Sequence, residues 1–466
     1  MDITPSEILK KITKFELRDW RRMNRLYEYY IGHARIPEDN DKLQGQGADK
    51  AAGRPNNHLY TNFAKNIVTN TTGYFMGTPV TYNCEDASLS DKINEIIDYN
   101  DDAFVNTRIA EHLSIFGRAA ELLYLEAIGD TTIPRYAAIN PMQLVYETTG
   151  DINDDLTLAI RWYDVFDDDD QRTRHIEVYD SAEIAYYVQN NGAGPLIPEI
   201  PPGRRSEVEP HYFGEVPINI YHNNDNDSGD YEDVISLIDA YNTMQSESVN
   251  DYQAFADAVM VVKNMRVDDE MADTLQGKRL IETFDDGDVS YLVKQVNDAY
   301  VENIKTRIQK DIYLASNTVN MSSEEFSGTL SGVAIQRRML NFENRVATTE
   351  RYFKKGLQRR FELICNFLNI SGSYDYMDIV PVFKRNVPAD ITEITTEVTQ
   401  LDGIVSRRTL LAQIPFVEDV DAEMEQLAKE QEERMQYNVG MFGQDDSILP
   451  QDDGDEPIED KDDGTN

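Results

Sequence analysis

The longest helix-like stretch of the sequence runs from Gly332 to Ile370, and it limits the folds that are open to the chain. At a rise of 1.5 Å per residue, a helix of roughly 40 residues extends about 60 Å, twice the diameter of a small domain. The 466 residues would otherwise suffice for about three ordinary domains. The alternative that this chain length leaves open is one elaborate subunit of a larger body.

Two further long helices are predicted, at Asp233–Lys263, with Asp230 as its N-cap, and at Asp298–Ala315. The stretch between them, Met265–Gln295, indicates a small α+β excursion with strands near RLIETF and VSYLVKQ. The remaining predicted elements are helices at Pro5–Ile36 and Tyr60–Thr71, an antiparallel sheet region at Ala119–Val188, a strand at Val216–Tyr221, helices after Ala389, and an acidic disordered stretch at Gly440–Asn466. The fold class is therefore α+β, dominated by helices.

The middle of the Asp233–Lys263 helix has an unusual composition. Its sequence QSESVNDYQ is mostly polar on all sides, whereas a core helix carries an apolar stripe. Such a segment is typical of a helix that faces a wet channel or other helices.

The charge of the chain argues against direct nucleic-acid binding. Lys and Arg number 44 against 85 Asp and Glu, which gives a net charge of −41. A surface of this sign repels polyanions instead of collecting them.

No motif for catalysis is complete. The small-residue loop within Met321–Met339 resembles a phosphate cradle, but Val333 and Ala334 follow Gly332 where a P-loop needs Lys and then Ser or Thr. A nucleophile elbow also fails, because Ser331 stands one position late for G-x-S-x-G. The sequence predicts neither an enzyme nor a cofactor.

Candidate metal sites are equally weak. Four successive carboxylates at Asp167–Asp170 point in different directions and are typical of a solvated turn. In the NNDNDSG run, the EF-hand register that starts at Asn224 places Ile235 where a bidentate Glu is needed. The six histidines lack metal-ligand spacing, and the two cysteines, Cys84 and Cys365, are too few for a disulfide scaffold.

Targeting signals are not predicted. The N-terminus has no signal-peptide core, and the longest apolar run, Ala258–Val262, is far shorter than the roughly 20 residues that span a bilayer. We expect the chain to work without a membrane, in the cytosol or in a particle assembled there.

The helix from Gly332 carries a basic face, which is the best candidate for phosphate contact. In so acidic a chain, we instead expect its cations to pair with acidic neighbours, including those of an adjacent subunit. The face comprises Arg337, Arg338, Arg345, Arg351, Lys354, Lys355, Arg359 and Arg360.

The order of several segments over about 420 residues resembles the portal proteins of tailed bacteriophages, in the branch of long-tailed phages of Gram-positive hosts. The segments that carry the resemblance are LYEYYIGHARI, PNNHLYTNFAKNIVTNTTGYFMGTPVTY, FGRAAELLYLEAIGD, AAINPMQLVYE, GEVPINIYHNNDNDSGDYEDVISLIDAYNTMQSESVNDYQAFADAVM, SSEEFSGTLSGVAIQRRM and TLLAQIPFVEDVDAEMEQLAKE. Each is weak alone, and their order is specific.

This resemblance implies a ring, usually of twelve subunits, at one capsid vertex of the virion, assembled in the host cytoplasm. Double-stranded DNA would pass through it during packaging and ejection. The implied parts are a wing (residues 1–230), stem helices (231–263 and 298–316), a clip (264–297), a tunnel loop (317–332), a long wing helix with a return strand (333–388), crown helices (389–438) and an acidic tail (439–466).

The resemblance also implies partners and channel residues. The partners are the large terminase packaging ATPase, a head-completion or adaptor protein, and the scaffolding and major capsid proteins. The channel residues are the tunnel-loop residues Ser322, Ser323, Glu324, Glu325, Phe326, Ser327, Gly328, Thr329, Leu330 and Ser331 and the stem residues Glu247, Asp251 and Asp311. The alternatives are a nucleotide-dependent packaging or nuclease enzyme and an acidic scaffolding or adaptor protein.

Overall fold

The computed structural model describes most of the chain, namely residues 3–33, 57–129, 131–192, 194–256, 259–263, 288–292, 298–320, 332–386, 396, 398–411, 414, 417 and 420–442. The chain divides into two compact units, Met1–Val387 and Pro388–Asn466. Each is described by itself.

The helices of the first unit are α1 (Pro5–Ile31), α3 (Phe63–Met76), α4 (Ala87–Asn100), α5 (Asp102–Phe116), α6 (Ile235–Ala256), α8 (Asp298–Ala315) and α9 (Gly332–Leu368). Its strands are β1 (Thr81–Cys84), β2 (Arg118–Ile128), β3 (Thr131–Ile139), β4 (Leu144–Thr148), β5 (Leu156–Phe166), β6 (Arg172–Tyr179), β7 (Glu183–Asn190), β8 (Ile197–Pro198), β9 (Val208–Pro210), β10 (Ile218–His222), β11 (Val259–Lys263), β12 (Asp288–Leu292) and β13 (Ile379–Val382). Short 3₁₀ turns lie at Pro141–Gln143, Glu232–Val234 and Tyr376–Asp378.

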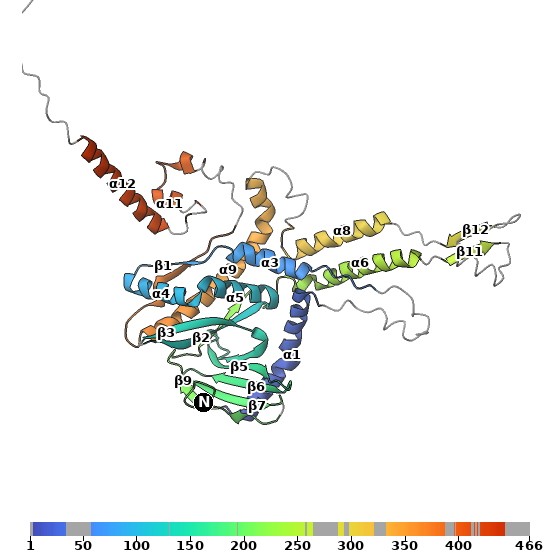
Figure 1. The fold of residues 1–466 in the computed structure, drawn as a ribbon, viewed down its shortest axis with the longest axis horizontal. Coiled ribbons are helices and arrows are strands. Elements are labelled where there is room, and N and C mark those ends of the chain that lie inside the picture. Colours follow the sequence, from blue (N-terminus) through green and yellow to red (C-terminus); the bar gives the residue numbers. More distant parts are fainter. Residues whose placement is uncertain are drawn as a thin grey trace, which may run out of the picture. The chain divides into compact units, whose positions relative to one another are not determined.

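Antiparallel strands form four sheets, which Figure 1 shows among the helices. The largest has the order β4-β5-β6-β7-β8, with β9 also paired to β7. A second sheet has the order β10-β2-β3, and β1-β13 and β11-β12 are two-stranded. The fold is α+β and rich in helices, as the sequence predicts.

Helix α1 covers the largest sheet because its sequence is amphipathic. It begins with a capping box between Thr4 and Glu7 and ends at Gly32, whose φ of 79° suits a residue without a Cβ. The ring of Phe15 meets Trp162 of β5 edge to face, with the centroids 5.6 Å apart. The apolar stripe of α1 is thereby buried, and its opposite face is left to solvent.

Helix α9 organises the second core. Its buried residues Phe353, Leu357 and Phe361 pack into a cluster with α3, α4, α5 and the β10-β2-β3 sheet. At Gly356 the helix comes so close to β10 that a Cβ would lie 2.2 Å from the ring of Tyr221. Glycine at this position therefore permits the contact.

A buried ionic cluster joins α9 to the elements it crosses. The fully buried Arg360 guanidinium forms ion pairs of 2.7 Å with Asp102 of α5 and with Glu121 of β2. It also lies over the ring of Tyr136, 4.3 Å from the centroid. Burial alone would lower the pKa of Arg360, but the charges of Glu121 and Asp102 outweigh it and hold the pKa well above the ordinary value. Arg360 is thus held in its charged form.

Several sequence expectations need correction. The Asp233–Lys263 helix ends at Ala256, and the β-branched run VMVVK that follows is strand β11, paired with β12. Asp230 is not the N-cap, because a 3₁₀ turn at Glu232–Val234 precedes α6, and Asp230 pairs with Arg345 instead. The helices predicted at Asp298–Ala315 and from Gly332 are confirmed, the latter ending at Leu368.

The second unit contains the helices α11 (Arg407–Leu411) and α12 (Val420–Phe442). Helix α12 continues to Phe442, three residues into the stretch predicted to be disordered at Gly440–Asn466. The strand near RLIETF, the Ser322–Ser331 loop and residues 443–466 lie outside the described residues.

Replacing Arg360 with Met should strongly destabilise the protein, because Asp102 and Glu121 would stay buried without a counter-charge. We expect a loss of about 3–5 kcal/mol in the free energy of unfolding, measured by chemical denaturation. The neighbouring Arg359 pairs with Glu215 and Glu362 near the surface. The control Arg359→Met should cost below about 1 kcal/mol, and equal losses in the two variants would refute the role of the cluster.

His112 should make stability depend on pH. Burial, with the nearby charge of Arg108, lowers its pKa to about 4 from 6.5. The unfolded chain therefore takes up a proton as the pH falls below 6.5 while the folded chain does not, so stability is lost from pH 6.5 down to 4. At pH 5 the loss is about 2 kcal/mol. His112→Gln should reduce the stability difference between pH 7 and pH 5 by this amount, whereas His33→Gln, at an exposed site, should leave it unchanged.

Candidate functional site

The acidic segments that the sequence offers as metal sites form turns in the described part of the chain. Among these residues, no group of His, Cys, Asp or Glu is arranged to hold a metal ion. The Asp167 carboxylate accepts the backbone N–H groups of Asp169 and Gln171, so the acidic run forms a capped turn as predicted. Asn224 does the same for Asn226 and Ser228 in the NNDNDSG loop, whose EF-hand register is incomplete.

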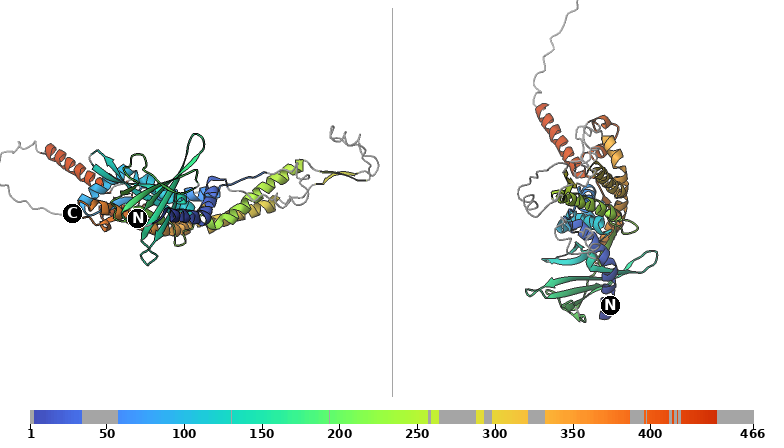
Figure 2. Two further views of the ribbon diagram at one scale, coloured as in Figure 1. Left: turned by 90° about the horizontal axis from the view of Figure 1, so that it is seen from below. Right: turned by 90° about the vertical axis from the view of Figure 1, so that its right-hand side faces the viewer.

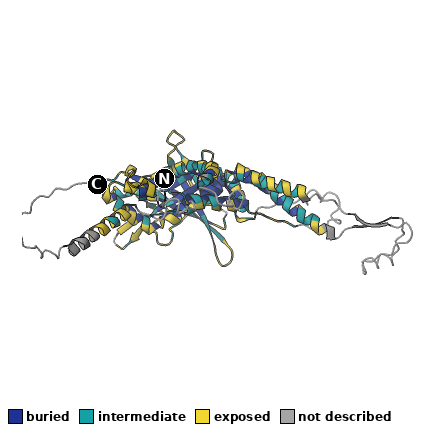
Figure 3. Ribbon diagram, turned by 90° about the horizontal axis from the view of Figure 1, so that it is seen from above, coloured by how far each residue is buried: buried dark blue, intermediate teal, exposed yellow. Residues whose placement is uncertain are grey.

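The most distinctive feature is a pair of helices, α6 and α8, that extends from the first unit. Figures 1 and 2 show the two helices side by side, and they contact each other. Figure 3 shows exposed residues along this pair. In chain order, α6 is followed by the paired strands β11 and β12 and then by α8.

Aromatic contacts hold the near end of the pair against α3. The ring of Phe63 meets Tyr241 of α6 edge to face at 5.0 Å and Tyr313 of α8 at 6.0 Å. On α1, Tyr29 donates a hydrogen bond of 2.6 Å to Asp239 of α6. Burial and this bond raise the pKa of Tyr29 to about 12, so the hydroxyl keeps its proton as a donor at neutral pH.

The polar middle of α6 binds an extended segment of the same chain. Asn242, Ser246 and Asn250, one helical turn apart, accept the backbone N–H groups of Thr61, Leu59 and Asn57 at 2.8, 2.9 and 2.7 Å. Four helical residues rise about 6 Å, and two extended residues rise about 6.6 Å, so the two repeats match. We call Asn242, Ser246 and Asn250 the α6 ladder.

The ladder revises one interpretation of the sequence. The polarity of QSESVNDYQ predicted a wet channel or other helices, yet Ser246 and Asn250 of this run face residues 57–61. Nothing in the sequence could assign this role, because the bound segment lies about 190 residues away. The ladder occupies one side of α6 only.

The predicted stem residues lie on other sides of the two helices. At 100° per residue, Glu247 points about 100° away from Ser246, and it is exposed. Asp251 is half-buried on α6, and Asp311 of α8 lies 3.9 Å from Arg307. The structure thus places Glu247, Asp251 and Asp311 on the helix pair but does not bring them together into one cluster.

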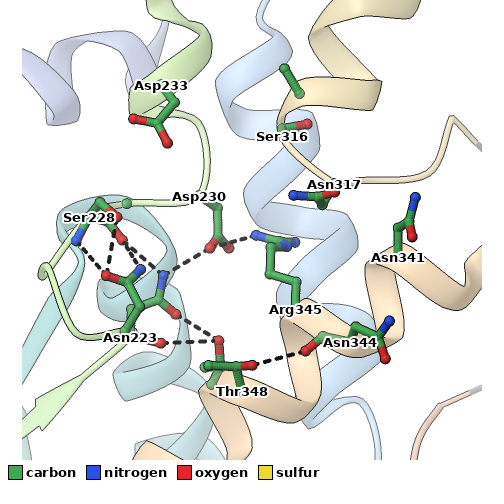
Figure 4. Close-up of a pocket in the computed structure, with 14 residues that line it drawn as sticks. Asn223, Ser228, Asp230, Asp233, Ser316, Asn317, Asn341, Asn344, Arg345 and Thr348 are labelled. Atoms are coloured by element: carbon green, nitrogen blue, oxygen red, sulfur yellow. Dashed lines mark hydrogen bonds and ion pairs between the residues drawn. The ribbon is translucent and has the colours of Figure 1, made fainter.

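A polar pocket of about 410 Å³ lies where the loop before α6, the end of α8 and helix α9 meet. Figure 4 shows Asp230 facing Arg345 across it, and their charged atoms are 2.6 Å apart. Arg345 also donates to Thr71 of α3, and Asp230 accepts from Ser114 of α5. These bonds attach the near end of the helix pair to the core.

The basic face of α9 is paired in large part, as predicted. Arg345, Lys354, Arg359 and Arg360 each form an ion pair with a carboxylate of the same chain. Arg337, Arg351 and Lys355 are exposed. These four of the eight cations therefore serve the fold instead of a polyanion.

No helix among the described residues combines the length and the apolar character that a bilayer span requires.

Removing the ladder should release the extended segment from α6. In a variant with Asn242→Ala, Ser246→Ala and Asn250→Ala, the amides of Asn57, Leu59 and Thr61 lose their acceptors. We expect their hydrogen exchange to accelerate at least about tenfold, the equivalent of 1.4 kcal/mol. The control Thr243→Ala with Glu247→Ala, away from the ladder, should leave exchange unchanged, and protected amides in the triple variant would contradict the assignment.

Comparison with known proteins agrees with the resemblance. The family model for phage portal proteins of the SPP1 Gp6-like type matches residues 9–437. The portal protein of Bacillus phage SPP1 is 25% identical over 424 residues, covering 88% of this chain and 82% of the relative. The portal protein of Clostridium phage phiCD119 is 22% identical over 390 residues, covering 78% and 83%. The chain belongs to the phage portal protein family of the SPP1 Gp6-like type.

Proposed function

We propose that the chain acts as one subunit of a ring, in the family's usual number of twelve, that conducts double-stranded DNA into and out of the capsid. The portal role in DNA packaging follows from family membership. The observation that supports the conduit is the helix pair α6 and α8, which extends from the core and carries exposed residues. Neither a nucleotide-dependent enzyme nor a scaffolding protein is favoured by the family match.

The parts of the chain take the following roles in this proposal. Residues 1–230 with 333–388 form the wing, residues 231–256 and 298–316 the stem, and residues 257–297 the clip, which includes the paired strands β11 and β12. The clip boundary moves from 264 to 257 because α6 ends at Ala256. Residues 317–332 form the tunnel loop, residues 389–438 the crown, and residues 439–466 the acidic tail.

The charges of the stem helices suit a conduit. Helix α6 carries three carboxylates, Asp239, Glu247 and Asp251, and no cation. Helix α8 is balanced, with three acidic and three basic residues. A wall with few cations releases few counterions and so does not hold the duplex. At physiological salt the repulsion acts over about 8 Å, which keeps DNA off the wall without closing the bore.

The further partners are those of a portal vertex. We propose that the clip contacts the packaging ATPase and later the head-completion protein, and that the wing and crown contact scaffolding and major capsid proteins. The vertex of the virion, after assembly in the host cytoplasm, is the site of action.

A cation on the exposed side of α6 should impede DNA movement. Glu247→Lys replaces a carboxylate with a phosphate-binding charge in every subunit. We expect the variant rings to retain duplex DNA on a filter at about 50 mM salt, to release it by about 200 mM, and to package less DNA per particle.

The matched control is Asp168→Lys, on the exposed β5-β6 turn of the wing. This variant should assemble, bind and package like the original protein. Packaging that is insensitive to Glu247→Lys, in rings shown to form by electron microscopy, would contradict a channel position for this face of α6.

A further inference from the structure

The solvent face of α1 carries a row of cations that the fold does not use. Lys14, Arg18 and Arg21 recur at intervals of four and three residues and are exposed, and within the described residues they form no ion pair. Leu17 is 60% exposed and Trp20 38% exposed beside them. We call Lys14, Arg18 and Arg21 the α1 basic row.

This combination is typical of a protein-binding surface. Phosphate contact needs cations alone, whereas protein interfaces combine Trp and Arg with apolar side chains at their centre. The partner of this row should therefore offer carboxylates and exposed apolar groups.

The same chain offers such a surface on α4. Asp91, Glu95 and Asp98 recur at the same intervals of four and three residues and are exposed, and within the described residues they form no ion pair. Near them, Tyr99 is 44% exposed and Phe104, in the first turn of α5, is 61% exposed. We call Asp91, Glu95 and Asp98 the α4 acidic row.

The two rows match in length but cannot meet within one subunit. Each spans seven residues of helix, about 10.5 Å, so three cations can stand level with three carboxylates when the helices lie parallel. Within the subunit, α1 and α4 pack against α5, which Figure 1 shows between them. Each row is therefore open to a second copy of the chain.

We propose that the α1 basic row of one subunit binds the α4 acidic row of the next. The contact is heterologous, since it joins two different surfaces, and repetition of such a contact closes a ring when the rotation permits. Exposed ion pairs contribute little singly, so the burial of Leu17, Trp20, Tyr99 and Phe104 would supply the larger share of the affinity. This inference rests on the ring assembly proposed above and assigns it an interface.

Charge reversal tests the interface in three proteins. Variant A carries Lys14→Glu, Arg18→Glu and Arg21→Glu, so both rows are acidic. Variant B carries Asp91→Lys, Glu95→Lys and Asp98→Lys, so both rows are basic. Variant C carries all six changes, so the α1 row is acidic and the α4 row is basic. The two rows again have opposite charges. Each is checked for its fold by circular dichroism and then for assembly by sedimentation and negative-stain microscopy.

We expect A and B to fold but to lose at least about tenfold in the fraction assembled at moderate salt, and C to recover it. An equimolar mixture of A and B should also form rings, because each A–B contact pairs opposite charges. A mixed ring requires an even number of subunits.

A charge-matched control and the A–B mixture separate this interface from a general effect of net charge. Arg337→Glu, Arg351→Glu and Lys355→Glu, exposed on α9, change the net charge as much as variant A and should leave assembly intact. If this control fails as A does and the A–B mixture stays unassembled, total charge is responsible and the proposal is wrong.

Rings of normal yield from A or B would overturn the interface while leaving the ring itself established. If those rings instead lost affinity for duplex DNA only in variant A, the basic row would be a nucleic-acid surface. Absence of rings from the unchanged protein would refute the proposed function itself, which keeps the two failures distinct.

Discussion

Helix α9 and its buried charge determine how the rest of the first unit is built. Arg360 pairs with Asp102 and Glu121, which belong to a helix and a strand far apart in the sequence from α9. Because an unpaired charge in the core is costly, these three elements hold one relative position. One end of α9 carries this cluster, and nearer its beginning Arg345 holds the loop that leads into α6. Helix α9 therefore helps to set the position of the α6-α8 pair, together with the contacts from α1 and α3.

This arrangement suits a protein that acts through the shape that it holds. The described residues contain no cluster suited to metal binding, and the buried histidines His112 and His211 have lowered pKa values because burial disfavours their charged forms. Polar side chains instead join elements of the fold to one another, as in the α6 ladder and the Asp230–Arg345 pair. These junctions fix the relative positions of the elements that they join.

The sequence predicted those elements whose boundaries depend on neighbouring residues in the chain. The α8 boundaries and the start of α9 follow from helical periodicity at Asp298 and Gly332. The end of α6 was missed, since VMVVK continues the apolar pattern without a breaker and becomes a strand only by pairing with β12. Arg359 and Arg360 are identical in sequence terms, yet one lies near the surface and the other is fully buried. The α6 ladder could not be predicted either, because the segment that it binds is distant in the chain. The family resemblance, by contrast, depended on segment order and was confirmed by comparison with known portal proteins.

The proposed position of the exposed side of α6, next to DNA in transit, can be measured by thiol accessibility. In a chain without Cys84 and Cys365, a single cysteine at Glu247 can be labelled with a maleimide in isolated rings and in particles stopped during packaging. We expect rapid labelling in empty rings and at least about tenfold slower labelling in DNA-filled particles, while a cysteine at Asp168 reacts equally in both. Equal reactivity at Glu247 in filled and empty rings would contradict it.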